Sequence, residues 1–298
     1  MHIVRFAEEP ARPQVGVLDE RGVAPIERVA GLGELLTLPR ADIQHLVTEA
    51  AARPERVARQ GVSLLAPADG RTEVWAAGVT YERSRAARVE ESKQQSVYEL
   101  VYEADRPELF FKAPAWRVVT DGQPAALRAD AANSVPEPEL AIVVNAGGEL
   151  IGATVCDDLT ARAIEGENPL YLPQAKIYTG SCALAARIRP WWEIPDPLAL
   201  TIRMRVLRDG AEVFTGETST ARLHRGFEDL VSWLFREIDL PEGAVLATGT
   251  GIVPPLDEGI EIGDVVEIEI DEIGTLRHEL VAAKNLRSAI VDCRDETP

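Results

Sequence analysis

Short apolar runs separated by turn-forming residues dominate the pattern of the chain from about residue 70 onward. Runs bounded by Gly, Pro, Asn and Asp in this way are typical of β-strands. We expect strands at 74–79, 108–113, 116–121, 126–129, 139–145, 149–158, 176–188, 199–210, 211–220, 245–250 and 264–281. Helical segments do not alternate with these runs, and no G-x-G-x-x-G occurs. The pattern therefore predicts an α+β, mostly β fold and argues against a doubly wound parallel sheet.

A helical period appears in few places. Apolar residues at positions 227, 230, 231, 234, 235 and 238 predict one amphipathic helix over 227–238. A long polar stretch at 84–105 also has helical character. Since it carries little apolar surface to dock, we expect it to be ordered mainly by a ligand.

The first part of the chain reads as a separate small unit. Two short strands at 2–6 and 15–19 precede two weak helical patterns at 26–38 and 41–60. The polar segment 64–72, which contains Pro and Gly, then has the composition of a linker. We therefore expect a small N-terminal α/β domain, 1–68, and a larger catalytic domain, 69–298.

Length, apolar content and cysteine usage favour an ordinary globular protein of the cytoplasm. The 298 residues are 46% hydrophobic and 27% charged, and no apolar run approaches the roughly 20 residues of a membrane helix. The first residues have no apolar core of a secretory signal. The three cysteines, Cys156, Cys182 and Cys293, are far apart and form no C-x-x-C pair, so neither a disulfide scaffold nor a thiolate zinc site is expected.

The charge balance excludes some partners. The chain has 49 acidic and 31 basic side chains, a formal net charge of −18, so most of its surface repels a polyanion and nucleic-acid binding is disfavoured. A small anionic substrate can still bind beside a metal ion or an Arg/Lys cluster. Only four residues are lysine, which makes any inward-pointing lysine of interest: Lys93, Lys112, Lys176 and Lys284.

A predicted β-hairpin brings acidic residues together. The sequence A-G-G-E joins the strands at 139–145 and 149–158, and a turn centred between its two glycines places Glu137 opposite Asp158 and Glu139 opposite Cys156. Glu137 and Glu139 share one face because strand side chains alternate, and Asp158 lies on that face. Their Cβ atoms would then lie about 5–8 Å apart.

Three such carboxylates repel one another unless a cation neutralises them. Oxygen ligands suit Mg²⁺, with Mn²⁺ or Ca²⁺ as alternatives, better than they suit Zn²⁺. The prolines on either side of Glu137 also hold it in an extended conformation. Two alternatives remain: a solvated strand end with ordinary surface acids, and an odd-length loop that shifts the register and brings Asp157 onto this face.

The segment 164–184 places a lysine near this hairpin in sequence. It begins as a loop rich in Pro, Gly and Asn and enters the predicted strand at Lys176. A lysine on an apolar strand is either a side chain that reaches past apolar surface to water, or a desolvated amine near a metal, with a lowered pKa, that acts as a base. Spacing alone leaves both open.

These segments carry a family resemblance. The residues P-E-P-E-L-A-I-V-V-N, G-A-T-V-C-D-D-L-T-A-R, E-N-P-L-Y-L-P-Q-A-K and G-T-G-I-V-P-P resemble the fumarylacetoacetate hydrolase superfamily over about 70–285. The run from Gly166 to Leu184, with G-V-T-Y-E-R-S and E-L-F-F-K-A before it, is similar to the branch that dehydrates 2-keto-3-deoxy-pentonates, the arabinonate and xylonate derivatives.

The resemblance implies a fold, a metal and site residues. It implies a mixed β-sandwich roll with a small N-terminal domain, assembled as a homodimer or a dimer-of-dimers tetramer. It implies Mg²⁺ on Glu137, Glu139 and Asp158, with Asp157 where the family usually has Asn, and an active-site lysine at Lys176. By the same resemblance, the substrate is held by the loop that contains Thr248, Gly249 and Thr250, and the pocket is lined by Phe110, Phe111 and Lys112.

One departure from the family bears on the reaction. Hydrolytic members resemble Asn-Tyr-x-x-His after the first core strand, and that His helps to activate water. Here Ser84 takes its place, and none of the four histidines lies near the motif in sequence. Serine is a poor general base at neutral pH, so elimination is favoured over hydrolysis.

The resulting hypothesis is a Mg²⁺-dependent dehydratase acting on a 2-oxo sugar acid. The metal polarises the 2-oxo group and Lys176 removes the C3 proton. Glu90 and Glu91 are candidates to protonate the leaving C4 hydroxyl, although their place in a polar helical run favours a solvated surface for them. A 2-keto-3-deoxy-pentonate then gives 2,5-dioxopentanoate, an intermediate of pentose catabolism. Ser84 and Arg85 are expected to contact substrate; for most of the arginines at 83, 85 and 88, however, a surface role is favoured.

Two alternatives stand beside this hypothesis. One is a metal-dependent hydrolase that cleaves the C–C bond of an acylpyruvate or a 2,4-dioxo sugar acid, and the same fold also hosts isomerases and decarboxylases. The other is a non-catalytic, metal-stabilised binding protein, for which three clustered acids and an inward-pointing lysine would be a surplus.

Overall fold

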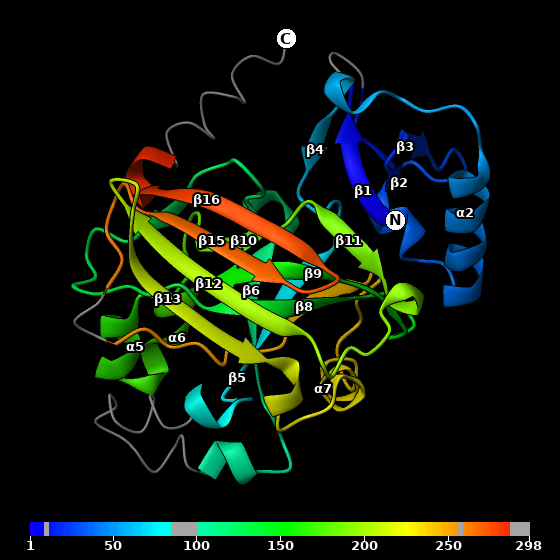
Figure 1. The fold of residues 1–298 in the computed structure, drawn as a ribbon. Helices are drawn as coiled ribbons and strands as arrows, with labels where there is room; N and C mark the ends of the chain where they lie inside the picture. Colours follow the sequence, from blue (N-terminus) through cyan, green and yellow to red (C-terminus); the bar gives the residue numbers. More distant parts are fainter. Residues whose placement is uncertain (9–11, 85–99, 256–258, 287–298) are drawn as a thin grey trace.

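Two β-sheets packed face to face form the body of the molecule. The computed structural model describes residues 1–8, 12–84, 100–255 and 259–286. In Figure 1 the smaller sheet, with β12, β13, β15 and β16, lies in front of β8 and β9 of the larger sheet. The predicted mostly β architecture of the α+β class is confirmed.

The larger sheet has eleven strands, in the order β3-β2-β1-β11-β9-β8-β14-β5-β6, with β10 paired to β9 and β4 to β1. Its strands are β1 (His2–Ala7), β2 (Gln14–Asp19), β3 (Gly22–Pro25), β4 (Ser63–Leu65), β5 (Glu73–Gly78), β6 (Glu108–Pro114), β8 (Pro138–Val144), β9 (Leu150–Asp158), β10 (Cys182–Leu184), β11 (Arg187–Pro190) and β14 (Ala244–Ala247).

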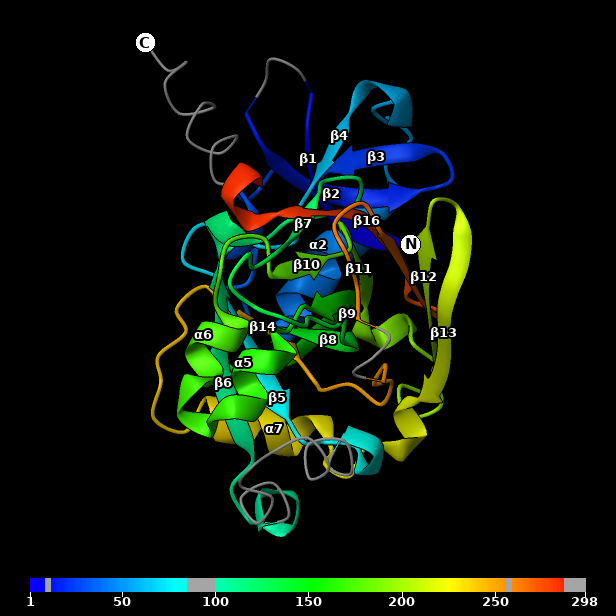
Figure 2. The same ribbon diagram turned by 90° about the vertical axis from the view of Figure 1, so that its left-hand side faces the viewer.

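The smaller sheet has five strands, in the order β13-β12-β15-β16-β7. They are β7 (Ala125–Leu127), β12 (Thr201–Arg208), β13 (Ala211–Ser219), β15 (Val265–Ile270) and β16 (Gly274–Ala282). The described helices are α1 (Leu32–Leu35), α2 (Arg40–Ala52), α5 (Arg162–Glu167), α6 (Leu172–Lys176) and α7 (Phe227–Leu234), with single turns η1 (Arg59–Gly61), η2 (Ala115–Arg117), η3 (Pro169–Tyr171), η4 (Trp191–Glu193) and η5 (Thr220–Arg222). Figure 2 shows α5 and α6 on the opposite side of β8 and β9 from β12 and β13.

Two apolar cores follow from the alternation of side chains on β8 and β9. Ile142 and Val155 point into the core between the two sheets, where they meet Ile268 and Leu276 of the smaller sheet. Residues of the opposite parity, such as Val143, pack in a second core that also contains residues of α2. Because both faces are covered, every residue of β8 and β9 is buried.

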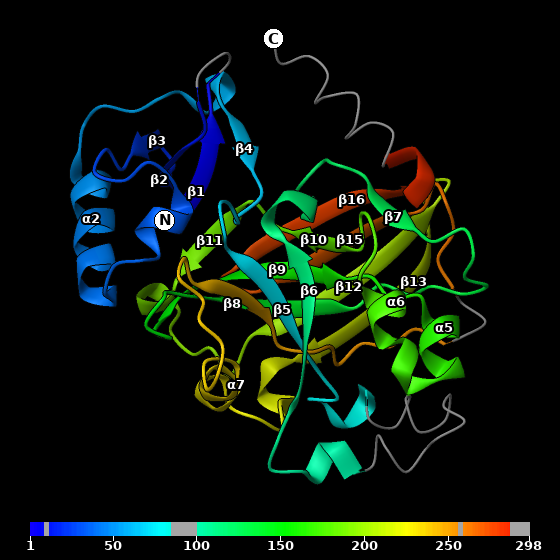
Figure 3. The same ribbon diagram turned by 180° about the vertical axis from the view of Figure 1, so that it is seen from behind.

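The N-terminal residues extend the larger sheet. Strand β1 pairs antiparallel with β11, with Ile3 opposite Ile188, so β1, β2 and β3 continue the sheet that contains the hairpin. Figure 3 shows this unit, with α2, to one side of β5 and β6. The division into domains 1–68 and 69–298 stays a prediction.

Several segments differ from the expectation. The run at 116–121 is not a strand, because η2 (Ala115–Arg117) occupies its start and Val119 forms only an isolated bridge with Ala183. Helix α7 ends at Leu234, short of the expected residue 238. The pattern at 26–38 gives only the short helix α1, which begins after Gly31, a residue with extended backbone angles. The run at 176–188 is not one strand: α6 ends at Lys176, and β10 and β11 follow after a turn in which Gly180 has φ +76°. The run at 264–281 is the hairpin of β15 and β16, whose turn at 271–273 leads into Gly274 with φ +136°.

The β8–β9 hairpin has the predicted register. Glu139 lies opposite Cys156, and Pro138 lies opposite Asp157. Beyond the strand, the Asp158 N–H donates to the Glu137 carbonyl at 3.0 Å, which places these two residues opposite each other. Register therefore sets Glu137, Glu139 and Asp158 on one face, as the sequence predicts.

The turn of this hairpin is one residue longer than predicted. Asn145 pairs with Glu149, their N–O distance being 3.1 Å, so the loop between them has an odd length. A β-bulge then leaves Ile151 unpaired between the pairs Val143–Gly152 and Val144–Leu150. The bulge restores the register that the longer loop would have shifted.

None of the helices in the described part of the chain combines the length and apolar character that crossing a membrane requires.

Close packing of β11 on β9 gives a testable prediction about Gly152. A Cβ atom at this position would lie 2.4 Å from Ile188 Cγ2 and 2.6 Å from the Arg189 carbonyl oxygen. We expect Gly152→Ala to lower the free energy of unfolding by about 1–3 kcal/mol, because backbone must move to accept the methyl group. Urea denaturation measures this change in the free energy of unfolding.

The matched control is Gly147→Ala in the exposed turn, where the nearest atom to a Cβ lies at 3.5 Å. That substitution should change the unfolding free energy by less than about 0.5 kcal/mol. Equal effects at both positions would contradict the packing argument.

Candidate metal centre

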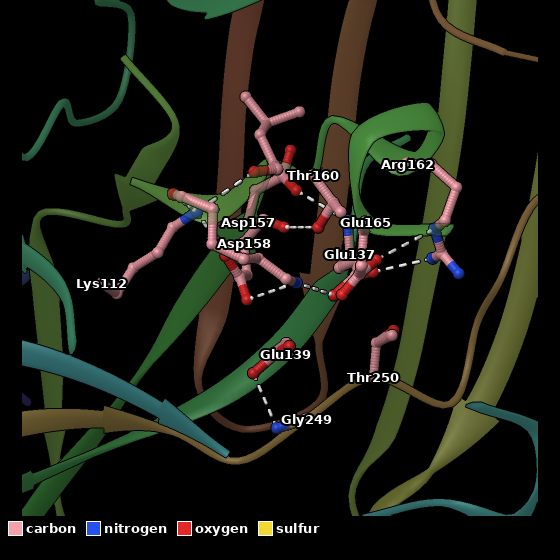
Figure 4. Close-up of polar contacts among 12 residues, drawn as sticks. Lys112, Glu137, Glu139, Asp157, Asp158, Thr160, Arg162, Glu165, Gly249 and Thr250 are labelled. Carbon is pink, nitrogen blue, oxygen red and sulfur yellow. Dashed lines mark hydrogen bonds and ion pairs between the residues drawn. The ribbon is translucent and has the colours of Figure 1, made fainter. Parts of the chain in front are cut away.

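Three buried carboxylates meet at the open end of the β8–β9 hairpin. Oxygen atoms of Glu137, Glu139 and Asp158 lie within 4.8 Å of one another. Their exposed fractions are only 2%, 1% and 1%. Figure 4 shows Glu137, Glu139 and Asp158 pointing toward a common space beside Thr250. Carboxylates this close and this buried require compensating positive charge.

Three cationic side chains provide part of this charge. The Lys176 ammonium lies 2.6 Å from Glu137 Oε2 and 2.8 Å from Asp158 Oδ2. Arg162 donates from Nη2 to Glu137 Oε1 at 2.7 Å. Lys112 forms an ion pair with Asp158 Oδ1. Glu137 and Asp158 each therefore have two cationic partners.

Lys112 reaches Asp158 because of a bulge in β6. Val74 of β5 pairs with Ala113 and Trp75 pairs with Phe111, so Lys112 is the extra residue. Its ammonium donates to the carbonyl oxygens of Leu159 (3.1 Å) and Lys176 (2.7 Å) and has 0% of its side chain exposed. Together with the ion pair to Asp158, these bonds surround the ammonium with three protein oxygens. Lys112 does not line the cavity beside the carboxylates, and its expected contact with substrate stays a prediction.

Lys176 is the last residue of helix α6, not the first residue of a strand as predicted. The helix is a single short turn with Pro173 as its second residue, and Ile177 after it has non-helical backbone angles. The helix end turns the side chain inward, where only 2% of it is exposed. Its ammonium also lies 5.5 Å from the centre of the Phe110 ring. Of the two interpretations left open by the sequence, this burial fits the desolvated amine.

Glu139 differs from the other two carboxylates, since in the described structure it forms no ion pair. Its Oε2 accepts a hydrogen bond from the Gly249 N–H at 2.7 Å. Burial raises the pKa of Glu139 well above its ordinary value of 4.5, and the nearby Asp158 and Glu137 carboxylates raise it further. Lys176 and the Gly249 N–H lower the pKa of Glu139, but by less than burial and the two carboxylates raise it.

The Gly249 N–H can reach Glu139 because glycine accepts the backbone conformation of this loop. Gly249 has φ +93°, and a Cβ atom there would lie 1.9 Å from Thr80 Oγ1. Thr80 in turn donates its hydroxyl hydrogen to the Thr248 carbonyl at 2.6 Å, which holds the loop against β5. The close approach of the two segments therefore requires glycine at this position.

The predicted substrate-binding residues divide into two groups. Ser84, Gly249 and Thr250 line a small pocket beside the carboxylates. Thr248 does not, because its hydroxyl donates to the Leu140 carbonyl at 2.8 Å within the protein. Phe111 also points away and packs edge to face on Trp75, with 5.9 Å between ring centres. Arg85 and the expected acid Glu90 lie outside the described residues.

The cavity is lined by one of the two phenylalanines that the resemblance implied and by two acids that the sequence did not single out. Phe110, rather than Phe111, lines it, because neighbouring residues of β6 face opposite sides of the sheet. Glu108 at the start of β6 and Glu165 on α5 also line it. Arg162 lies within the quoted T-A-R motif, and a cation there could have been inferred from the surplus of acids.

The residues present fit a hard divalent cation. The site offers three carboxylates and no sulfur or imidazole ligand, the oxygen-only set that Mg²⁺, Mn²⁺ and Ca²⁺ prefer. Burial of the set and the ion pairs around it restrict the carboxylates to one arrangement. Lys176 Nζ lies between two of them, where positive charge is most stabilised.

Comparison with known proteins places the chain among relatives of similar length. Residues 73–281 match the family model described as "Fumarylacetoacetate (FAA) hydrolase C-terminal". The chain is 44% identical over 208 residues to "2-dehydro-3-deoxy-D-arabinonate dehydratase" of Saccharolobus solfataricus, covering 68% of this chain and 70% of that protein. It is 40% identical over 259 residues to "Probable 2-keto-3-deoxyxylonate dehydratase" of Haloferax volcanii, covering 86% and 89%.

Solved structures show the same relationship. The chain superposes on the structure of "2-keto-3-deoxy-D-arabinonate dehydratase complexed with magnesium and 2,5-dioxopentanoate" with a TM-score of 0.80 and 32% identity, covering 95% of this chain and 99% of that one. This match confirms the predicted β-sandwich roll. A maleylpyruvate hydrolase from Sphingobium matches with a TM-score of 0.69 over 95% and 100% of the chains, but at 17% identity that likeness shows the fold alone.

The raised pKa of Glu139 predicts that Mg²⁺ binding releases protons and tightens as the pH rises. The metal binds ionised carboxylates, whereas the metal-free site favours protonated Glu139. Because the folded-state pKa lies above the unfolded value, the metal-free fold loses stability as the pH rises from about 4.5 toward the raised pKa. Isothermal titration calorimetry with Mg²⁺ in two buffers of different ionisation enthalpy measures the protons released.

Glu139→Gln is the control for this measurement. The amide has no proton to release, so its binding should be weaker and its heat of binding less dependent on the buffer. Heats of the unaltered protein that do not depend on the buffer would contradict the assignment of the raised pKa to Glu139.

Proposed function

We propose that this chain, which belongs to the fumarylacetoacetate hydrolase family, is a Mg²⁺-dependent hydro-lyase. Its reaction removes water from a 2-keto-3-deoxy-pentonate and yields 2,5-dioxopentanoate, the compound bound to magnesium in the similar dehydratase structure. The observation that carries the proposal is the buried Lys176 amine, which shares two carboxylates with the candidate metal site.

Glu137, Glu139 and Asp158 would hold the metal ion. When bound there, Mg²⁺ supplies a Lewis acid for the 2-oxo group, which makes the C3 hydrogens more acidic, and a positive charge that favours the neutral form of the Lys176 amine. The positions of two carboxylates do not depend on the metal alone, because Arg162 binds Glu137 and Lys112 binds Asp158.

Lys176 is the proposed base. A neutral amine can take the C3 proton. In the metal-free site the Glu137 and Asp158 carboxylates and the Phe110 ring stabilise the ammonium form, and a bound dication would replace that positive charge and free the amine. As the C3–H bond breaks, its electron pair forms a C3–C4 double bond, and the C4–O bond breaks. The proton resides on the amine, and the leaving oxygen needs a second proton to depart as water.

Three acids are candidates to supply this second proton. Glu90, proposed from the sequence, lies outside the described residues. Glu108 and Glu165 both line the cavity, and neither belongs to the carboxylate triad. Glu108 is the first residue of β6, whose next inward side chain is Phe110. A carboxylic acid there or at Glu165 would donate to the C4 hydroxyl, and the unsaturated product then tautomerises to 2,5-dioxopentanoate.

Elimination requires no activated water, which agrees with the residue at position 84. Ser84 is buried and donates its hydroxyl hydrogen to the Tyr81 carbonyl at 2.9 Å. It therefore offers no base for hydrolysis. The alternative of a C–C hydrolase rests on the fold that the chain shares with maleylpyruvate hydrolase at 17% identity. The identities of 40–44% to two dehydratases favour the hydro-lyase.

We further propose that the protein works in the cytoplasm, in the breakdown of pentose-derived acids, as a homodimer or a dimer of dimers. Among the described residues, Cys156 and Cys182 are buried free thiols, which suits a reducing compartment. Several large apolar side chains are exposed, as expected of a subunit that buries them against another: Trp116, Leu170 and Ile262. Size-exclusion chromatography with light scattering measures the mass, and a monomer would contradict this proposal.

The decisive experiment is an NMR time course with Mg²⁺ and a racemic 2-keto-3-deoxy-pentonate, repeated with EDTA and with an acylpyruvate. We expect metal-dependent formation of 2,5-dioxopentanoate.

Lys176→Met should lower kcat by about 10²–10⁴-fold, the contribution typical of a positioned acid or base. Removing the ammonium should also lower the stability of the metal-free protein, and Mg²⁺ should restore it, because the dication compensates the same carboxylates.

Lys284→Met is the matched control, because it makes the same change at an exposed lysine. It should leave both kcat and stability nearly unchanged. Cleavage of the acylpyruvate with the sugar acid untouched would contradict the dehydratase and support the hydrolase.

A further inference from the structure

We propose that Asp157 and His278 form a positioning pair that fixes the metal-binding residue Glu137 from the opposite face of the sheet. The inference rests on the proposed function, because the carboxylates must first bind a metal. Its subject is a different pair of residues, located behind the hairpin and outside the cavity.

Asp157 and Asp158 are neighbours in sequence but face opposite sides of β9. Asp158 belongs to the carboxylate triad, whereas Asp157 is directed at the smaller sheet and has 0% of its surface exposed. A carboxylate buried in an apolar core is costly unless hydrogen bonds satisfy both of its oxygens. Both oxygens of Asp157 are satisfied, and the two partners define its role.

The first partner is the backbone of Glu137. The Glu137 N–H donates to Asp157 Oδ1 at 2.9 Å. Pro136 and Pro138 have no N–H, so Glu137 carries the only backbone donor of residues 136–138. This N–H binds the Asp157 side chain and not a backbone carbonyl of the partner strand. The orientation of Glu137 thus depends on the position of the Asp157 carboxylate.

The Asp158 carbonyl, which lies opposite Glu137, accepts a hydrogen bond from a side chain instead of from Glu137. The Thr160 hydroxyl donates to the Asp158 carbonyl at 2.9 Å. Asp158 in turn donates its N–H to the Glu137 carbonyl at 3.0 Å. The strand entry at Glu137 is thus connected to β9 by one backbone bond and one bond to Asp157, and loss of the latter would leave a buried N–H without a partner. Figure 4 shows Asp157 beside Glu137, with Asp158 next to it.

The second partner comes from the other sheet. His278 lies on β16, is 1% exposed, and its Nε2 lies 2.8 Å from Asp157 Oδ2. Within the described residues, Nδ1 of His278 has no hydrogen-bond partner. A neutral ring with its hydrogen on Nε2 donates to Asp157 and leaves Nδ1 as a bare acceptor, which costs less than an unpaired N–H.

A chain of contacts therefore runs from the core between the sheets to the metal centre. His278 fixes Asp157, Asp157 fixes the Glu137 backbone, and the Glu137 carboxylate lies in the triad. Neither His278 nor Asp157 lines the cavity, so both are positioning residues and not catalytic ones. Partners of metal ligands that act in this way typically contribute about 10–100-fold to metal affinity or activity.

The test measures Mg²⁺ affinity of the full chain by isothermal titration calorimetry, without substrate. We expect His278→Leu to weaken Mg²⁺ binding by about 10–100-fold. His278→Gln, which can keep a donor toward Asp157, should restore most of the affinity. In turnover, kcat/KM should fall at limiting Mg²⁺ and recover at saturating Mg²⁺.

Leu280→Ala on the same strand is the control for general destabilisation. Leu280 is fully buried in the core between the sheets and belongs to the apolar cluster there. It should lower the midpoint of thermal unfolding but leave Mg²⁺ affinity unchanged. If Leu280→Ala weakened Mg²⁺ binding as much as His278→Leu, the role of His278 would be structural and the proposal wrong.

Two substitutions at Asp157 keep the test informative if His278→Leu does not fold. Asp157→Asn retains an oxygen for the Glu137 N–H and a nitrogen that can donate to Nε2 after the ring proton moves to Nδ1, so it should bind Mg²⁺ almost normally. Asp157→Leu fits an apolar core but strands the Glu137 N–H, and it should lose affinity. Equal affinity of these two variants would overturn the proposal. Absence of Mg²⁺ binding by the unaltered chain would instead overturn the proposed function.

Discussion

The burial of three carboxylates in one place is the constraint on which the rest of the site depends. Glu137, Glu139 and Asp158 cannot all be ionised at this separation without positive charge close by. The fold supplies that charge from three elements, which carry Lys112 on β6, Lys176 on α6 and Arg162 on α5. The cations satisfy Glu137 and Asp158 and leave Glu139 for a divalent ion to complete. Two of the four lysines in the chain are committed to this balance.

The hairpin was predictable because strand alternation and turn composition are local properties. Alternation alone places Glu137 and Glu139 on one face, and the apolar body of the hairpin fixes which face of each strand is buried. The length of the turn was not predictable in the same way. Two differences, a longer loop and the extra residue Ile151, compensate each other, so the correct register followed from a turn that differs from the one assumed.

The residues that were misplaced or missed depend on backbone irregularities and on contacts between distant segments. A bulge directs Lys112 to Asp158, and no periodic pattern announces a bulge. The strand position of Lys176 was wrong because the short helix α6, with a proline in its first turn, ends there. Arg162 and Glu165 follow Asp158 closely in sequence, but their side chains meet the triad only because α5 folds back beside the hairpin. The fold class and the acidic triad therefore followed from the chain alone, whereas the cations and the cavity lining required its three-dimensional path.

The pairing of β1 with β11 has a consequence for the integrity of the catalytic part. The family match begins at residue 73, yet the sheet that carries the hairpin continues into the first strands of the chain. Without residues 1–68, the backbone of Arg187–Pro190 would become an open sheet edge with unpaired N–H and C=O groups. Such an edge can recruit a strand from another molecule. The N-terminal unit thus covers the edge of β11 and moves the end of the sheet from β11 to the four-residue strand β3, a shorter template for strand addition.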